Sequence, residues 1–153
     1  MMALYEMPGH LIRRMNQISV ATFLQEAQTA GFDLTPVQFA AIYAIARNEG
    51  IDQATLSSLI AYDRVTIGGV VDRLLTKGLI RREVSEKDRR ARELYLTEKG
   101  RDLLEAMMPA VQKVQERMLE GLSAEERASL VALLKKATAG ASAGSSGVQN
   151  EGE

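Results

Sequence analysis

The chain of 153 residues contains no cysteine and a single histidine. Without cysteine the protein can form no disulfide, no thiolate metal site and no thiol redox switch. The sequence also lacks a nucleophile elbow, a phosphate-binding glycine loop and any recognisable metal-ligand spacing. These absences argue against most enzyme classes, and we expect a protein that is no enzyme and binds neither a cofactor nor a metal.

Long apolar runs are also missing, and the first residues do not have the layout of a signal peptide. We therefore expect a cytoplasmic protein without a membrane partner. The net charge of −1 and the pI near 5.9 argue against a generally basic, histone-like protein. With 46% hydrophobic residues, the chain is long enough to bury one core. Any contact with nucleic acid must come from a local patch.

Such a patch occupies residues 81–92, "RREVSEKDRRAR", with six basic and three acidic side chains. It lies between two strand-like runs, "LIRREV" and "RELYL". Strand, polar tip and strand predict a hairpin whose tip is strongly basic.

Helical patterns precede the hairpin. Residues 10–29 carry apolar side chains on more than one narrow stripe, which predicts a helix buried on two sides, as in a dimer. Thr35, Pro36 and Gln38 form the signature of a capping box at the start of a second helix. Leu34 has the spacing of a hydrophobic staple, and the helix should end before Gly50.

Two short helices follow, the first capped by Asp52 and the second by Asp63, with Gly78 in the helix-terminating position. This is the helix-turn-helix arrangement. The inward face of the second helix is expected to carry Ile67, Val70, Val71, Leu74 and Leu75.

After the hairpin, Thr97 can cap a long helix that Pro109 should kink or locally break. Ser123 and Glu126 form a second capping box before a last helix. The fold class is therefore mainly α: a winged helix-turn-helix domain with flanking helices. We assign residues 1–34 to an N-terminal dimerisation helix, 35–100 to the winged helix-turn-helix DNA-binding domain, 101–137 to C-terminal helices and 138–153 to a disordered tail.

Residues 66–100, "TIGGVVDRLLTKGLIRREVSEKDRRARELYLTEKG", contain the motifs D-R-L, K-G-L, D-x-R and L-T-x-x-G in order. This pattern resembles the MarR family of bacterial transcription regulators. The resemblance implies an obligate homodimer shaped like a triangle, in which the first helix (residues 1–34) and the C-terminal helices (residues 101–137) form a dimerisation base. Its two winged domains would straddle a pseudopalindrome in double-stranded DNA.

The predicted DNA contacts come from the second helix of the helix-turn-helix and from the hairpin tip, or wing. They are Asp63, Arg64, Thr66, Ile67, Gly68, Gly69, Arg73, Lys77, Arg89, Arg90 and Arg92. Asp63, Arg64, Thr66 and Ile67 would contact bases. Arg73 and Lys77 would contact phosphates, and the wing arginines would enter or border the minor groove. The alternative for the wing is a merely solvated loop. Asp88, which phosphates would repel, should hold Arg90 or Arg73 in place.

Gly68 and Gly69 depart from many relatives, which carry polar or basic side chains at these positions. Each glycine inside a helix costs about 1 kcal/mol relative to alanine, so something must offset that cost. Two explanations remain open, close approach of the backbone to the major groove and close packing against a neighbouring helix.

A second cluster contains His10, Arg13, Arg14 and Gln17 on one face of the first helix. With Tyr43 it can form a pocket for a small carboxylate. The alternative is a solvated helix start or salt bridges between subunits. The stretch "PGHLIRR" resembles the opening of MarR-type repressors of aromatic-acid catabolism, which implies a benzoate, hydroxycinnamate or nicotinate effector.

The main hypothesis is a homodimeric repressor that an aromatic acid releases from its operator. Two rivals stay open, an enzyme acting on such acids and a winged-helix protein that serves as an adaptor or binds DNA nonspecifically.

Overall fold

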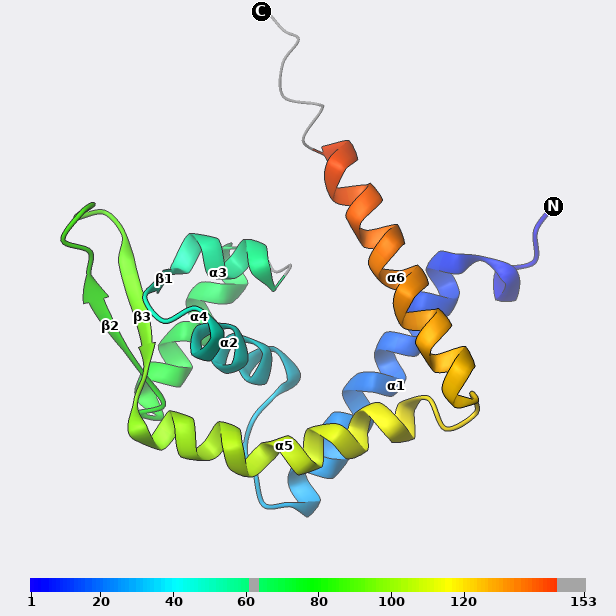
Figure 1. Cartoon of the computed structure of the whole chain (residues 1–153), viewed down its shortest axis with the longest axis horizontal. Helices are drawn as coiled ribbons and strands as arrows, with labels where there is room; N and C mark the ends of the chain where they lie inside the picture. The colour runs from blue at the N-terminus through cyan, green and yellow to red at the C-terminus, as the bar shows by residue number, and fades with distance from the viewer. Residues whose placement is uncertain (61–63, 146–153) are drawn as a thin grey trace, which may run out of the picture. The chain divides into compact units, whose positions relative to one another are not determined.

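The computed structural model of the chain describes the backbone of residues 1–60 and 64–145 and the side chains of residues 1–60 and 65–141. The chain divides into two compact units, Met1–Met118 and Leu119–Glu153. The first unit contains a helical bundle beside a β-hairpin, which is drawn in green in Figure 1. None of the helices in the described ranges is long and apolar enough to cross a membrane.

A short 3₁₀ helix, η1 (Leu4–Glu6), precedes α1 (Pro8–Thr29). We predicted that α1 begins at residue 10, but Pro8 occupies its first turn, where the missing N–H costs no hydrogen bond. α1 packs along the helix α5 (Glu98–Met118), and Arg117 of α5 ion-pairs with Glu26 of α1.

The capping signals of the sequence are confirmed. Thr35 Oγ1 accepts from the Gln38 backbone N–H at 3.3 Å, and Gln38 Oε1 accepts from the Thr35 N–H at 3.3 Å. They begin α2 (Pro36–Arg47), which ends three residues before the positive-φ Gly50. Gly78, with φ of +70°, lies just beyond the end of α4 (Arg64–Thr76), as expected.

The sheet has the strand order β1-β3-β2 and is antiparallel throughout. β2 (Ile80–Val84) and β3 (Arg92–Leu96) form the predicted hairpin, with Ile80 opposite Leu96. β1 (Ile51–Asp52) was not predicted, because two residues are too few to show a strand pattern. It pairs with β3 just before the helix α3 (Gln53–Leu59) and thereby fixes the helix-turn-helix to the hairpin.

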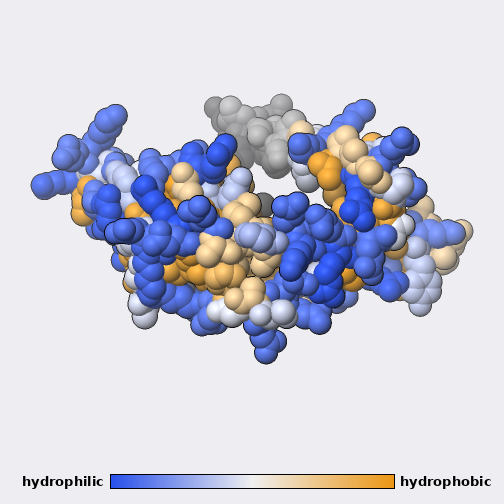
Figure 2. Space-filling view, turned by 60° about the horizontal axis from the view of Figure 1, so that its bottom comes forward, coloured by the Kyte–Doolittle hydropathy of each residue, from blue (hydrophilic) through white to orange (hydrophobic). Residues whose placement is uncertain are grey.

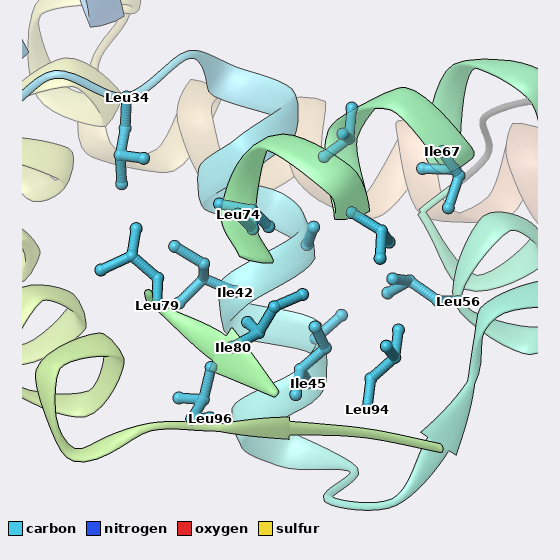
Figure 3. Packing of buried hydrophobic residues seen from close by; sticks show 14 of the residues in the cluster. Leu34, Ile42, Ile45, Leu56, Ile67, Leu74, Leu79, Ile80, Leu94 and Leu96 are labelled. Atoms are coloured by element: carbon cyan, nitrogen blue, oxygen red, sulfur yellow. The ribbon is translucent and has the colours of Figure 1, made fainter. Parts of the chain in front are cut away.

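One hydrophobic core joins these elements, as Figure 3 shows. Ile67 and Leu74 of α4 belong to one buried cluster with Ile42 and Ile45 of α2. Leu94 of β3 closes the core from the sheet side. Burial of these branched side chains, at about 1.5 to 3 kcal/mol each, holds α4 and the hairpin in a defined arrangement. The remaining fully buried side chains of the core include Leu56, Val71, Leu79 and Met107.

α5 begins after Thr97, whose Oγ1 accepts from the Gly100 N–H at 3.1 Å, so the predicted cap is confirmed. The helix continues without interruption through Pro109, and the predicted local break is wrong. Pro109 is exposed on α5, where it removes one backbone hydrogen bond and its ring crowds the carbonyl four residues earlier, and α5 stays helical despite this cost.

The second unit consists mainly of α6 (Ala124–Ser145), with Ser123 Oγ accepting from the Glu126 N–H at 3.2 Å. We predicted that a disordered tail begins at residue 138, which is wrong for residues 138–145 because α6 extends to Ser145. The alternating alanines of this stretch explain the extension, since alanine has the highest helix propensity. Residues 146–153 lie outside the described residues.

Candidate nucleic-acid interface

α3 and α4 form the helix-turn-helix and pack against each other. Asp52 caps α3 as predicted: its carboxylate accepts from the Thr55 backbone N–H and from Thr55 Oγ1, both at 2.7 Å. These hydrogen bonds lower the pKa of Asp52 below its ordinary value of 3.8. The turn residues 61–63, including the expected cap and base contact Asp63, lie outside the described residues.

α4 places its apolar face inward as expected, and this corrects one predicted DNA contact. The side chain of Ile67 is fully buried in the core, where it packs as Figure 3 shows. A buried side chain cannot reach a base edge without unfolding the domain. Ile67 is therefore a core residue, and its inward periodicity with Val70, Val71 and Leu74 was the signal to follow.

The outward face of α4 carries the other predicted contacts. Thr66 and Arg73 are exposed, and Arg64 begins the helix. Gly69 has no atom within 4 Å of the position that a Cβ would take, and at Gly68 the nearest atom is Gln53 Nε2 at 3.7 Å, an ordinary contact. Neither glycine is needed for packing within the chain, so the packing explanation loses its support.

Lys77 has hydrogen-bond partners within its own chain. Its ammonium group donates to the Asp33 backbone oxygen at 2.6 Å and to Gln38 Oε1 at 3.4 Å, and it lies 3.5 Å from the Asp33 carboxylate. It thus ties the end of α4 to the segment before α2. With these partners Lys77 has a structural role in the free chain, and its contact with a phosphate stays a prediction.

In the wing tip between β2 and β3, side-chain oxygens accept hydrogen bonds from backbone N–H groups of the tip itself. Ser85 Oγ accepts from the N–H groups of Lys87 and Asp88, each at 3.3 Å. Asp88 Oδ1 in turn accepts from the Arg90 backbone N–H at 3.0 Å. The sequence identified Asp88 as the residue that positions Arg90, but the bond is to the backbone of Arg90 and not to its guanidinium.

The wing arginines have different surroundings. Arg89 and Arg90 are exposed, whereas Arg92 Nη1 donates to the Arg89 carbonyl at 2.9 Å. Arg92 therefore braces the tip from which the other two project. In the space-filling view of Figure 2, the hairpin end of the molecule at the left presents a mainly hydrophilic surface.

Two arginines of β2 were left out of the predicted contacts. Arg82 lies 3.7 Å from Asp72 of α4, and Arg81 lies over the ring of Tyr95 with its guanidinium carbon 4.3 Å from the centroid. Asp72 belongs to the D-R-L motif, and the Arg82 pair links α4 to the wing. Such a long-range pair has no local signal in the sequence.

A cleft of about 610 Å³ lies between the start of α3 and the wing. Its walls include Asp52 and Gln53 on one side and Arg90 and Arg92 on the other. The cleft brings the beginning of the helix-turn-helix next to the wing arginines, a juxtaposition that depends on β1 and is invisible in the sequence.

The predicted carboxylate cluster is only partly assembled. His10 packs edge-on against Tyr5 at 5.6 Å between ring centroids, and its Nε2 is buried without a hydrogen-bond partner in the described part of the chain. Arg13, Arg14 and Gln17 are exposed on α1.

Tyr43 lies apart from this cluster. Its ring stacks at 6.0 Å on Phe39, which lies 5.9 Å from Phe23 of α1. His10 precedes Phe23 by thirteen residues, which is roughly 20 Å along a helix. Tyr43 lines a different cavity, of about 490 Å³, with residues of α2, β3 and α5. This cavity includes none of the other four predicted residues, and a shared site for all five stays a prediction.

The described chain thus contains a helix-turn-helix followed by a basic wing, which defines a winged helix protein. A profile of the MarR family matches residues 32–91. The transcriptional repressor NicR of Pseudomonas putida is 36% identical over 131 residues, covering 86% of this chain and 82% of that protein. The chain belongs to the MarR family and is a transcriptional regulator of that family, which confirms the resemblance.

Solved structures agree. The regulator BpsR of Bordetella bronchiseptica, described with the regulation of its DNA binding by 6-hydroxynicotinic acid, superposes with a TM-score of 0.83 at 31% identity, covering 90% of this chain and 97% of that one. The repressor CouR bound to a 23-mer DNA duplex gives a TM-score of 0.80 at 28% identity, covering 88% and 94%.

Proposed function

We propose that the protein is a homodimeric transcriptional repressor that binds a pseudopalindromic operator and is released by a small aromatic carboxylate. The proposal that the protein binds DNA is supported mainly by the contact between the recognition helix α4 and the wing. The outward face of α4 is free of packing at Gly69, and Arg82 of β2 pairs with Asp72 of the same helix. α4 would enter the major groove while Arg89 and Arg90 reach the adjacent minor groove.

The experiment is selection of fragmented genomic DNA on the purified protein at about 150 mM salt, sequenced with and without a panel of aromatic acids. We expect enrichment of a palindrome with half-sites roughly 10 bp apart. Loss of that enrichment with one acid would identify the effector. Absence of any preferred sequence would contradict the specific-repressor function.

Exposed apolar side chains support the homodimer. On α1, Leu11, Ile12, Ile18 and Leu24 are each more than 40% exposed. On α6, considered by itself, Val131, Leu133 and Leu134 are exposed to a similar extent. Helices with uncovered apolar faces need a partner, and a second copy of the chain offers matching ones.

The oligomeric state is tested by light scattering during size-exclusion chromatography. We expect a dimer of the native chain. Leu133→Glu should shift the protein toward monomer, whereas Lys135→Glu on the same helix should leave it dimeric. A monomeric native protein at micromolar concentration would contradict the homodimer.

An aromatic acid effector is supported by the α1 cluster and by the similar proteins. Arg13 and Arg14 can neutralise a carboxylate, and the buried Nε2 of His10 offers an unsatisfied polar atom beside the ring of Tyr5. Within one chain, the cavity that Tyr43 lines includes none of these α1 residues. A complete pocket would therefore combine α1 of one chain with α2 of its partner. BpsR, which is similar to this chain and whose DNA binding is regulated by 6-hydroxynicotinic acid, adds weight to a nicotinate-type acid.

The effector is tested by calorimetric titration of benzoate, 4-hydroxycinnamate and 6-hydroxynicotinate. We expect one of them to bind and to weaken operator affinity by about 5- to 150-fold, the usual range of allosteric coupling. Arg13→Gln should reduce acid binding, and Lys113→Gln on α5 serves as the charge-matched control. Binding of none of the three would contradict the effector class.

Each of the alternative functions predicts a distinct experimental result. Turnover of one of these acids by the purified protein would indicate an enzyme, and we expect none. DNA binding without sequence preference at moderate salt would indicate a nonspecific binder.

A further inference from the structure

One apolar side chain projects from the exposed side of the recognition helix. Val65, the second residue of α4, is 87% exposed. Helical spacing places it on one face with Gly68 and Gly69, one turn further on. The opposite face carries Ile67 and Val70, which are at most 2% exposed.

A single exposed valine is common on protein surfaces, so its position carries the argument. The next turn on its face has no side chain beyond hydrogen, and a Cβ at Gly69 would meet nothing within 4 Å. A groove floor can therefore approach the helix backbone closely. Among the side chains that the structure describes, from residue 65 onward, Val65 stands out from this face near the helix N-terminus. That end contacts base edges in helix-turn-helix proteins.

The chemistry of valine limits what it can recognise. Its side chain has no donor or acceptor, so it cannot distinguish the polar edges of bases in the major groove. Apolar side chains contact the thymine 5-methyl group there. Valine is also β-branched, and in a helix it keeps one preferred χ1 rotamer, so its methyl groups are already positioned before binding.

We infer that Val65 is a specificity-determining residue that reads the 5-methyl group of a thymine in each half-site. This inference rests on the proposed function, because it requires a sequence-specific operator. Direct polar readout falls to neighbouring residues, and Val65 adds a preference for thymine at one position of each half-site.

The test uses the operator obtained by genomic selection and replaces its thymines by uracil, one symmetric pair of positions at a time. Uracil pairs with adenine as thymine does and removes only the methyl group. For the native protein we expect one pair at which the dissociation constant rises. Loss of one buried methyl group corresponds to about four-fold per half-site, or about 16-fold for both.

Val65→Ala assigns the effect to the side chain. This variant should bind the thymine operator more weakly and lose the uracil penalty to within about two-fold, because it lacks the two γ-methyl groups of valine and its Cβ is too short to reach the thymine methyl group. Val84→Ala, which alters an exposed valine of β2, should keep the full penalty. A change of DNA shape would persist in Val65→Ala, so an equal penalty in both proteins overturns the inference.

Insensitivity of the native protein to every uracil substitution also overturns it, while specific operator binding would show that the proposed function stands. If genomic selection yields no operator, the proposed function itself fails, and the inference falls for that separate reason.

Discussion

The Cα of Gly100 in α5 lies directly against the carbonyl group of Leu79, the residue before β2. A Cβ at position 100 would overlap the Leu79 oxygen. Around this contact, Thr97 Oγ1 donates to the Gly78 carbonyl at 2.7 Å and Lys99 Nζ donates to the Lys77 carbonyl at 2.8 Å. The family motifs K-G-L and L-T-x-x-G therefore meet in space and join the end of the recognition helix to the start of α5.

Gly100→Ala should destabilise the protein, because the obstructing atoms belong to backbone that cannot rotate away. Overpacking of this kind typically costs about 1 to 3 kcal/mol, and we expect the upper part of that range. Urea unfolding followed by circular dichroism measures the free energy of unfolding. An unchanged midpoint would show that α5 can shift at no cost and that the glycine has no steric role.

Much of the fold could be predicted because its signals are local. The capping box of Thr35 and Gln38, the Asp52 cap and the terminating Gly78 each involve residues within a few positions of one another. Their physical effect is the same in any fold, since they satisfy backbone groups that a helix end leaves unpaired. Helix boundaries therefore agree with the sequence to within a few residues, except at the C-terminal end of α6, which extends eight residues beyond the predicted one.

The features that sequence reasoning missed depend on contacts between distant segments. β1 is recognisable only by its partner strand β3, and Lys77 has its partners about 40 positions away. Ile67 was given two incompatible roles, and its burial decides between them. At Ile67 the apolar periodicity of the helix predicted burial and the position in the recognition helix predicted a base contact. The structure agrees with the periodicity.

Asp52 should make the stability of the helix-turn-helix depend on pH. Its pKa in the folded protein is below the ordinary 3.8, so its stabilising contribution is present above pH 3.8 and is lost as the pH falls through the lowered value. The native protein should therefore lose stability relative to Asp52→Asn, which cannot titrate there, as the pH falls below 3.8.

The measurement is urea unfolding of both proteins over a pH series. Thr55→Val removes the side-chain hydrogen bond to Asp52 and keeps the backbone one. Compared with Asp52→Asn, this variant should lose less stability on acidification than the native protein does. If the difference in unfolding free energy between the native protein and Asp52→Asn does not change with pH, the hydrogen bonds at the start of α3 do not stabilise the Asp52 carboxylate.

Lys77 distinguishes a structural role from a phosphate contact. Lys77→Met removes the hydrogen bonds to Asp33 and Gln38, and we expect a loss of about 1 kcal/mol in the free energy of unfolding. The slope of log K for DNA binding against log salt should stay the same, because no phosphate contact is lost. A clear decrease in that slope would support the sequence-based prediction.

Gly69→Ala separates folding from DNA binding. A Cβ there meets no atom within 4 Å, so alanine should stabilise the helix by up to about 1 kcal/mol. If the glycine serves close approach to the groove, the same variant should bind the operator more weakly. The pair of measurements is thermal unfolding and operator titration, and a stabilised variant with native affinity would rule out the approach explanation.

Arg90 tests the wing. Its side chain is exposed while its backbone N–H is held by Asp88, so Arg90→Ala should leave the fold intact. Each lost phosphate contact reduces the slope of log K against log salt by about 0.9, so a dimer should lose up to about 1.8.

Arg92→Ala should reduce affinity too, through the tip that Arg92 braces at the Arg89 carbonyl. Lys113→Ala on α5 removes the same charge away from the wing and should keep the native slope. If Arg90→Ala keeps it as well, the wing does not lie on the phosphate backbone, and the major-groove helix must supply the electrostatic part of binding.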